Sequence, residues 1–340
     1  MGRPTVPPSP EKPEKVGNPV SNLLRLLGRR LLALPLMVLG VTFLVFVLMS
    51  FSSVDPAAAT LGESASPEAL AQWRADRGLD DPLLVRYFRY LGGLLTGDLG
   101  TSFRGESINS MVANNFPITL QLTFVGLFVA VTLALVLGVL AALFRDRWPD
   151  QVIRIFSIAC LATPSFWLAL LMIQAFANIP GGLGWFPAVV TDWVHFTDDP
   201  SGWLRQITLP AIALGVPVAG SLTRVVRTAM VEELDKDYVR TAIGAGIPKP
   251  IVIARNVLRN ALITPLTVLG LRIGYLMGGA VVIEMIFNIQ GMGQLIFQGI
   301  TQNDVPIVQG VTITVAIAFI VINMIVDLLY VLVNPRIRSI

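Results

Sequence analysis

The stretch "ITLQLTFVGLFVAVTLALVLGVLAAL", residues 118 to 143, decides the fold class because it contains no Asp, Glu, Lys or Arg. A helix of roughly 20 mostly apolar residues is long enough to cross the hydrocarbon core of a bilayer. The whole chain shares this character, since 54% of its residues are hydrophobic and 14% charged, against about 25% charged in soluble domains. The sequence therefore predicts an all-α integral membrane protein.

About six membrane-spanning helices are indicated by the hydrophobic pattern. Four further stretches are mostly apolar, at about 31–51, 153–177, 263–287 and 307–333. A sixth, at about 207–229, is weaker because Pro210 and Pro217 interrupt it. An even number of spans returns the chain to its starting side.

Lys and Arg residues near the span ends predict the orientation, because cytoplasmic loops carry an excess of them. They gather before the first span, after residue 143, within 230–260 and at the C-terminus, whereas the loop at 52–117 is rich in acids. We expect both termini in the cytoplasm. The net charge of +3 is then a sign of topology, and we expect no nucleic-acid partner.

Three segments are predicted from this pattern. Residues 1–24 are rich in proline and polar residues, cannot bury a core and are expected to form a disordered cytoplasmic tail. Residues 25–117 hold the first span and an extracytoplasmic loop. Residues 118–340 form the remaining core, with a charged cytoplasmic loop at about 230–260.

Enzymatic chemistry finds little support in the sequence. The chain has no G-x-x-x-x-G-K-[ST] phosphate loop, no H-E-x-x-H and no G-x-S-x-G. Its one cysteine, Cys160, and one histidine, His195, leave almost no material for a metal site. We expect a non-catalytic chain that binds no cofactor, no metal and no ATP itself.

Charged side chains inside spans are costly and usually face a partner or a water-filled cavity. Arg272, Glu284 and Asp327 are such residues. Arg272 and Asp327 lie at similar depths in their spans, so we expect them to pair, either as a structural ion pair or along a substrate path. Glu284 lies near the outer end of its span and is interpreted as a gate or cap residue.

The charged loop "MVEELDKDYVRTAIGAGIPKPIVIARNVLRN", residues 230–260, interrupts this apolar chain. Residues 228–243 have the spacing of an amphipathic helix, Gly246 fits a left-handed C-terminal cap, and Pro248 prevents continuation. A second helix resumes at Ile251, which makes two short cytoplasmic helices joined by a glycine elbow. Spacing alone leaves open whether they lie on lipid headgroups or dock on a soluble partner.

The loop resembles the Ala-x-x-x-Gly motif with which bacterial ATP-binding-cassette (ABC) importer permeases dock on their ATPase, in the version of the dipeptide, oligopeptide and nickel family. Other motifs of that family match in order over nearly everything after residue 25. They are "GLDDPLLVRYFRYLGGLLTGDLGTSF" (78–103), "TPSFWLALL" (163–171), "GGAVVIEMIF" (278–287) and "NMIVDLLYVLVNPRIR" (323–338). The chain departs from the family in having Gly244, Ala245 and Gly246 where Ala-Lys-Gly is usual, which removes one potential charge contact with the ATPase.

This resemblance implies a type I ABC importer permease fold with cytoplasmic coupling helices, in a bacterial plasma (inner) membrane. It also implies a second homologous permease subunit, two ATPase subunits that bind ATP and Mg, and an extracytoplasmic solute-binding protein. The expected docking residues are Tyr238 as an aromatic anchor, Ala242 for close approach and Gly246 as the elbow. The full set of expected ATPase-coupling residues is Glu232, Glu233, Asp237, Tyr238, Arg240, Ala242, Gly246 and Arg255.

Di- or oligopeptides are the substrates that the resemblance favours, with nickel, glutathione or another small solute as alternatives. Candidate path-lining residues are Gln121, Thr123, Asn288, Gln298 and Asn323. Two other classes of function remain open. An ion-driven carrier would use Glu284 and Asp327 as proton sites and act alone, and a scaffold would recruit cytosolic proteins without transport.

Overall fold

Residues 19–51, 55–62 and 65–333 are described by the computed structural model, and within these ranges the chain is helical with no β-strand. Two isolated bridges, Thr101 with Ser107 and Ala177 with Phe186, are its only extended pairings there. The predicted all-α class is confirmed. The first seven helices are α1 (Pro19–Ser50), α2 (Pro56–Leu61), α3 (Pro67–Asp76), α4 (Leu83–Leu95), α5 (Ile108–Leu143), α6 (Trp148–Ala162) and α7 (Ser165–Phe176).

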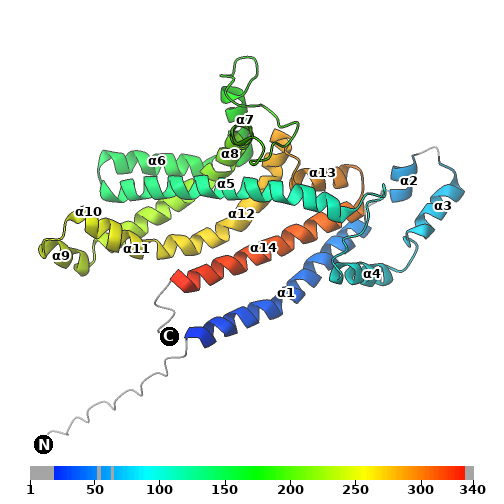
Figure 1. The fold of residues 1–340 in the computed structure, drawn as a ribbon, viewed down its shortest axis with the longest axis horizontal. Coiled ribbons are helices and arrows are strands. Elements are labelled where there is room, and N and C mark those ends of the chain that lie inside the picture. The colour runs from blue at the N-terminus through cyan, green and yellow to red at the C-terminus, as the bar shows by residue number, and fades with distance from the viewer. Residues whose placement is uncertain (1–18, 52–54, 63–64, 334–340) are drawn as a thin grey trace, which may run out of the picture.

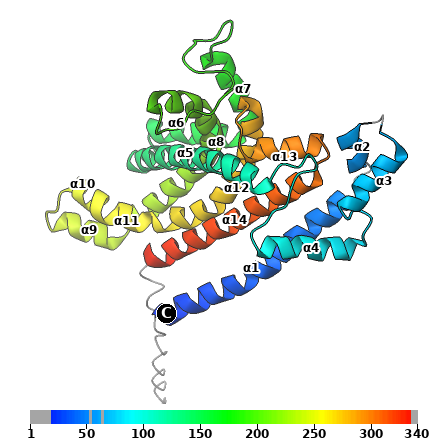
Figure 2. The same cartoon turned by 45° about the vertical axis from the view of Figure 1, so that its right-hand side comes forward.

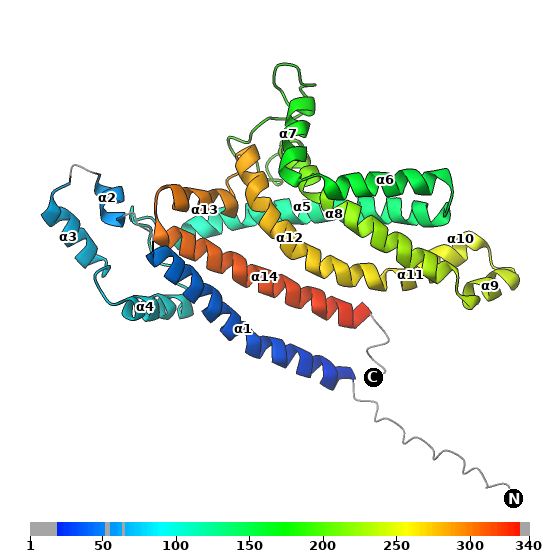
Figure 3. The same cartoon turned by 180° about the vertical axis from the view of Figure 1, so that it is seen from behind.

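The second half of the chain continues with α8 (Pro200–Leu234), α9 (Asp237–Gly244), α10 (Lys249–Val252), a π-helical turn at Ile253–Val257, α11 (Leu258–Ala261), α12 (Ile263–Phe287), α13 (Met292–Thr301) and α14 (Val305–Val333). The long helices make one bundle, with α2–α4 at one end and α9–α11 at the other (Figure 1). The same separation is visible from behind (Figure 3). The predicted charged loop and the predicted outer loop therefore lie at opposite ends of the molecule.

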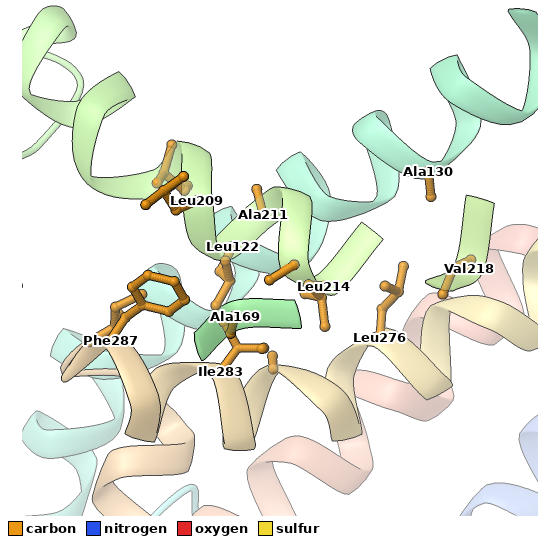
Figure 4. Packing of buried hydrophobic residues seen from close by; sticks show 14 of the residues in the cluster. Leu122, Ala130, Ala169, Leu209, Ala211, Leu214, Val218, Leu276, Ile283 and Phe287 are labelled. Carbon is orange, nitrogen blue, oxygen red and sulfur yellow. The ribbon is translucent and has the colours of Figure 1, made fainter. Parts of the chain in front are cut away.

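Helices α5 and α8 form the centre of the bundle and approach each other closely. A Cβ at Gly138 would lie 2.7 Å from Cβ of Val226 on α8, and one at Gly126 would lie 3.0 Å from Leu214. Small residues allow such close packing in membrane helices, where dispersion contacts replace the hydrophobic driving force. Leu214 also meets Leu276 and Ile283 of α12 in the main apolar cluster (Figure 4).

The edge of the bundle is made by α14 and α1, which run side by side (Figures 1 and 2). Helix α14 also packs on α12 and α13. Its start is fixed by the buried Asp304, whose carboxylate accepts hydrogen bonds from the backbone N–H of Phe103 at 2.8 Å and of Ile307 at 3.3 Å. This carboxylate ties the outer loop to the bundle.

The predicted span at 153–177 is wrong in one respect, because it is two helices, α6 and α7, that meet at an angle of 103°. Thr163 has an extended backbone (φ −83°, ψ 118°) and Pro164 follows it. A residue before proline is driven out of the helical region, and proline cannot continue the hydrogen-bond ladder. The chain therefore turns at "TP", and α7 diverges from α6 (Figure 1) while Ala169 and Met172 of α7 stay packed in the main apolar cluster.

By length and composition, the described residues contain four helices that could cross a membrane, or up to six if each of two bent pairs counts as one span. The bent pairs are α6 with α7 and residues 272–287 with α13, the second bent by 72°. Residues 35–50 of α1 form a shorter apolar helix. The predicted spans at 118–143, 207–229, 263–287 and 307–333 all fall within helices of the structure.

Two predictions concern residues near the ends of the chain. Residues 1–18 of the predicted disordered tail lie outside the described residues, whereas residues 19–24 belong to α1. The C-terminal Arg336 and Arg338, used to predict orientation, also lie outside the described residues.

Candidate functional site

The elbow between α9 and α10 is closed by backbone hydrogen bonds around Gly246. The N–H of Gly246 donates to the carbonyl of Ile243 at 3.0 Å, and that of Ile247 donates to the carbonyl of Ala242 at 3.2 Å. This pair of bonds is the Schellman motif, which requires a left-handed residue at the position after the cap. Gly246 has φ +87°, so its predicted role as the left-handed cap is confirmed.

The expected amphipathic helix at 228–243 is wrong as a single element. Helix α8 continues to Leu234, and α9 begins at Asp237 after Lys236 adopts an extended backbone (φ −72°, ψ 147°). Beside the break, Asp235 accepts a hydrogen bond from Arg145 of the loop between α5 and α6 at 2.7 Å. Helix α8 thus ends at Leu234, and α9 is a separate short helix between α8 and the elbow. We call α9 the arm.

An apolar cluster fixes this arm to the end of the bundle. Val239 of α9 is buried and packs with Met230 of α8 and with Val252 and Val257 of the returning segment, while Tyr238 and Ala242 are partly buried against it. Tyr238 and Ala242, expected as docking residues, therefore face the chain's own interior. These contacts join the elbow to the end of α8.

Hydrogen bonds around Glu233 reinforce the same joint. The buried carboxylate of Glu233, at the end of α8, accepts a bond from the Tyr238 hydroxyl at 2.9 Å and forms an ion pair with Lys236. Asn260 donates to the Tyr238 oxygen at 3.5 Å. Burial, helped by the neighbouring carboxylate, raises the pKa of Tyr238. The phenol therefore stays protonated and able to donate at neutral pH.

The outward face of the elbow is mixed in character. Glu232, Asp237, Arg240 and Arg255 of the expected coupling set are exposed. The ion pair of Arg240 with Asp237, at 4.0 Å, is open to solvent and contributes little to stability. Three isoleucines, not singled out in the sequence, lie exposed among these charges: Ile243, Ile247 and Ile251, with exposed fractions of 41%, 43% and 52%.

A buried ion pair missed by sequence reasoning holds α6 to α8 near the elbow. The carboxylate of Asp150 is fully buried and accepts two hydrogen bonds from Arg227, each 2.6 Å long. It also accepts the backbone N–H of Asp146 at 3.0 Å. The sequence signal for this pair is weak, because Asp150 and Arg227 lie 77 residues apart in the chain.

Replacing Asp150 by Asn should destabilise the chain by about 3–5 kcal/mol, because it leaves a largely buried guanidinium without its counter-charge. Asp146→Asn is the matched control, since the side chain of Asp146 is 75% exposed in its pair with Arg145 and such pairs contribute about 0–1 kcal/mol. The thermal unfolding midpoint in detergent should fall clearly for Asp150→Asn alone. Equal midpoints would show that the pair adds nothing.

Glu284, interpreted as a gate or cap residue, lies fully buried at the bend between α12 and α13. Its carboxylate accepts the hydroxyl of Thr119 on α5 at 2.6 Å and the backbone N–H of Gly293 at 2.6 Å. The Thr119 oxygen in turn accepts the N–H of Met292 at 2.8 Å. Glu284 therefore caps the start of α13 and joins it to α5. We call this hydrogen-bonded set of Glu284, Thr119, Met292 and Gly293 the α13 latch.

The predicted pair of Arg272 with Asp327 is not tested, because the side chain of Asp327 lies outside those described. Arg272 donates a hydrogen bond to the hydroxyl of Ser221 on α8 at 2.8 Å. This contact links α12 to α8 within the bundle. An ion pair of Arg272 with Asp327 of α14 would add a second contact to the hydrogen bond with Ser221.

The five candidate path residues lie on several elements. Gln121 of α5 accepts the indole N–H of Trp203 at 2.8 Å, and Asn288 donates to the Val190 carbonyl at 3.2 Å. Thr123 is buried, Gln298 is exposed on α13, and Asn323 bonds the Phe319 carbonyl of its own helix at 2.9 Å. Gln121 and Asn288 thus join segments of the chain. Among the described residues no group of three or more His, Cys, Asp or Glu could hold a metal ion.

Comparison with known proteins gives consistent matches over nearly the whole chain. The family model "Binding-protein-dependent transport system inner membrane component" matches residues 134–339, and the model of its N-terminal part matches residues 23–123. A protein of Brucella abortus (strain 2308) assigned to peptide transport as a permease is 38% identical over 307 residues, covering 90% of this chain and 96% of that protein.

Two further similarities bear on relatives and on fold. The glutathione transport system permease protein GsiC of Salmonella paratyphi A is 35% identical over 318 residues, covering 93% of this chain and 99% of that protein. A chain of the MetNI methionine ABC transporter, solved in inward-facing conformations, has a TM-score of 0.54 at 17% identity, covering 66% of this chain and 96% of that one. This likeness shows the type I permease fold.

Proposed function

This chain belongs to the family of binding-protein-dependent transport system inner membrane components, and on that premise we propose that it forms a translocation path for di- or oligopeptides with a second, homologous permease subunit. The family consists of non-catalytic, multi-pass inner membrane permease subunits of ABC transporters. The relatives assigned to peptide transport support peptides as the substrate. Relatives assigned to glutathione transport keep another small solute as the alternative.

The observation that carries the mechanism is the rigid joint between α8 and the elbow. A closed Schellman turn and a buried apolar cluster join the short helix pair to the end of α8, which supports the proposal that they move as one body. We propose that two ATPase subunits bind ATP and Mg, dock on this elbow and move it when they close. The chain itself would bind no nucleotide and no cofactor.

The proposed orientation places the elbow and both termini in the cytoplasm. It rests on the Lys and Arg excess on that side of the spans. The end of the molecule that carries α2–α4 would then face the solute-binding protein (Figure 1). Import follows if the binding protein delivers peptide at that end.

The docking contact is proposed to centre on the exposed isoleucines of the elbow, with Asp237, Arg240 and Arg255 around them. An apolar centre within a charged rim is typical of protein interfaces. The docking surface would be supported on its inner side by Tyr238, Ala242 and Glu233. Their role is to hold the elbow in place, because they contact α8 and its neighbours.

The sharpest test is Ile243→Asp beside Ile243→Leu in the complex purified with its partners from the native membrane. The aspartate should lower recovery of the ATPase and ATP-driven uptake of a labelled dipeptide into proteoliposomes at least tenfold, about 1.4 kcal/mol of docking free energy. The leucine should retain both, because it keeps the apolar contact.

Uptake that requires ATP and the partner chains would support the importer. Uptake by this chain alone, driven by a proton gradient and unaffected by Ile243→Asp, would instead establish an ion-driven carrier. Docking of cytosolic proteins without any uptake would establish a scaffold.

A further inference from the structure

Helix α4 lies against α1 and turns an apolar stripe outward. The buried Tyr87 places its hydroxyl 3.1 Å from the Leu39 carbonyl and 3.1 Å from the Thr42 hydroxyl of α1. On another face of α4, Leu84 and Phe88 are 60% and 66% exposed. An isolated apolar face of this kind on an amphipathic helix is typical of helices that lie in a membrane interface.

The contact with α1 places α4 beside an apolar segment. Thr42 lies about 12 Å along α1 from its end at Ser50, at 1.5 Å per residue, and residues 35–50 of α1 are apolar. Leu44 and Leu48 of that segment are also exposed, by 59% and 62%. The exposed faces of α1 and α4 therefore meet the same hydrocarbon and headgroup region.

The polar face of α4 lines a cavity of about 450 Å³, within the range of about 300–1,000 Å³ common for ligand sites. Its other walls come from the outer part of α1, the turns before α4 and after it, and the start of α14. The α4 residues in the wall are Arg86, Arg89, Tyr90 and Gly93. The cavity thus lies directly behind the apolar stripe.

Hydrogen-bond donors dominate the unsatisfied groups in this wall. Arg86 stands 5.7 Å above the Phe46 ring and reaches the Leu79 carbonyl at 3.4 Å, and within the described ranges no carboxylate lies within 4.0 Å of it. The Tyr90 hydroxyl is buried and has no hydrogen-bond partner in the part of the chain described here. Burial raises the pKa of Tyr90 to about 12, so its proton stays available to donate.

The carboxylates of the wall already have partners. Asp98 accepts the Gly100 N–H at 2.8 Å, and Asp76 accepts the Gln72 amide at 2.7 Å. Arg89 is likewise paired, with Asp81 at 2.7 Å. A second guanidinium in the wall, that of Arg77, stands 4.1 Å from the centroid of the Trp73 ring and donates to the Phe103 carbonyl at 3.4 Å. The donors left for a ligand are thus the two guanidinium groups of Arg86 and Arg77 and the buried Tyr90 phenol, which favour a hydrogen-bond acceptor, preferably an anion.

We propose that this cavity binds the phosphate of a membrane phospholipid headgroup, with Arg86 and Tyr90 as donors. The apolar stripe on the opposite face of α4 argues for a lipid over a soluble anion, because it would hold this helix, and with it the cavity, at the membrane interface where phospholipid headgroups lie. The lipid would fill the gap between α4 and α1 and so fix the N-terminal part of the chain to the bundle. This inference depends only on the chain lying in a membrane and stands apart from the proposed peptide transport.

The test is native mass spectrometry of the purified full chain titrated with dioleoyl phosphatidylglycerol. Wild type should bind one lipid saturably, and Arg86→Gln should weaken this binding roughly tenfold, as expected for loss of a charge-assisted hydrogen bond. Arg104→Gln is the matched control, because Arg104 is exposed in the same outer segment and does not line the cavity. Its affinity should equal that of wild type.

A second variant keeps the test decisive if Arg86→Gln does not fold. Tyr90→Phe preserves the ring and removes only the hydroxyl, and it should weaken lipid binding several-fold. Equal affinity of wild type and both variants would overturn the proposal, as would equal binding of dioleoylglycerol, which lacks the phosphate. Inorganic phosphate that competes fully with the lipid at equal concentration would assign the cavity to a free anion instead.

Discussion

Replacing Gly246 by Val is expected to abolish ATP-driven uptake while the chain still inserts into the membrane at its normal level. Gly246 has φ +87°, a region that β-branched residues adopt only under strain of about 1–3 kcal/mol. The chain relieves this strain by opening the two backbone bonds of the Schellman turn. The elbow then loses its fixed angle to α8, and a push from the ATPase is no longer transmitted.

Gly244→Val supplies the matched control for this experiment. Both glycines have open space where a Cβ would be added, but Gly244 is the last residue of α9 and has no positive φ. Uptake into proteoliposomes and the ATPase activity of the assembled complex should therefore be affected by Gly246→Val far more than by Gly244→Val. Normal uptake by the Gly246 variant would show that the turn is not part of the transmission.

The turn at Gly246 could be predicted from sequence because it depends on local chemistry. A glycine followed by Pro248 at the end of an amphipathic pattern fixes a helix stop wherever the segment lies in the fold. The bend at Pro164 is also local, yet the apolar run at 153–177 is unbroken in hydropathy. A hydropathy window counts apolar residues and does not register a change of direction.

Which face of α9 is buried could not be read from its spacing. The pattern identifies an amphipathic helix, but the apolar residues include both Val239, buried against α8, and Ile243, exposed. Only the packing of α8 and the returning segment distinguishes them. The same limit applies to Asp150 and Arg227, whose pairing joins residues far apart in sequence.

Glu284 shows how sequence and structure combine at a buried charge. The sequence indicated a costly carboxylate near a span end and suggested a gate or cap. The structure supplies its partners, Thr119 and the first turn of α13. They give the carboxylate a structural role and weaken the interpretation of Glu284 as a proton site of an ion-driven carrier.

Replacing Glu284 by Ala should release α13 from α5 and strongly destabilise the chain. It leaves the buried Thr119 hydroxyl and Gly293 N–H without their acceptor, at about 1–3 kcal/mol for each donor. The thermal unfolding midpoint in detergent should fall, and the backbone N–H groups of Met292 and Gly293 should exchange with solvent much faster. Glu284→Gln should be milder, because its amide oxygen still accepts one of the two bonds.

The transport activity of the Glu284→Gln variant distinguishes a structural role of Glu284 in the α13 latch from a role as a proton carrier. An amide cannot take up and release a proton at neutral pH, so a carrier that depends on Glu284 would lose all transport in this variant. A latch needs only an acceptor, and uptake should then follow the stability of the variant, with Glu284→Gln more active than Glu284→Ala. Thr119→Val provides the matching change on α5, because it removes the hydroxyl that joins Met292 to Glu284. If Thr119→Val left α13 exchange and uptake unchanged while Glu284→Gln abolished uptake in a stable protein, the carboxylate would have to act through its proton rather than through its hydrogen bonds.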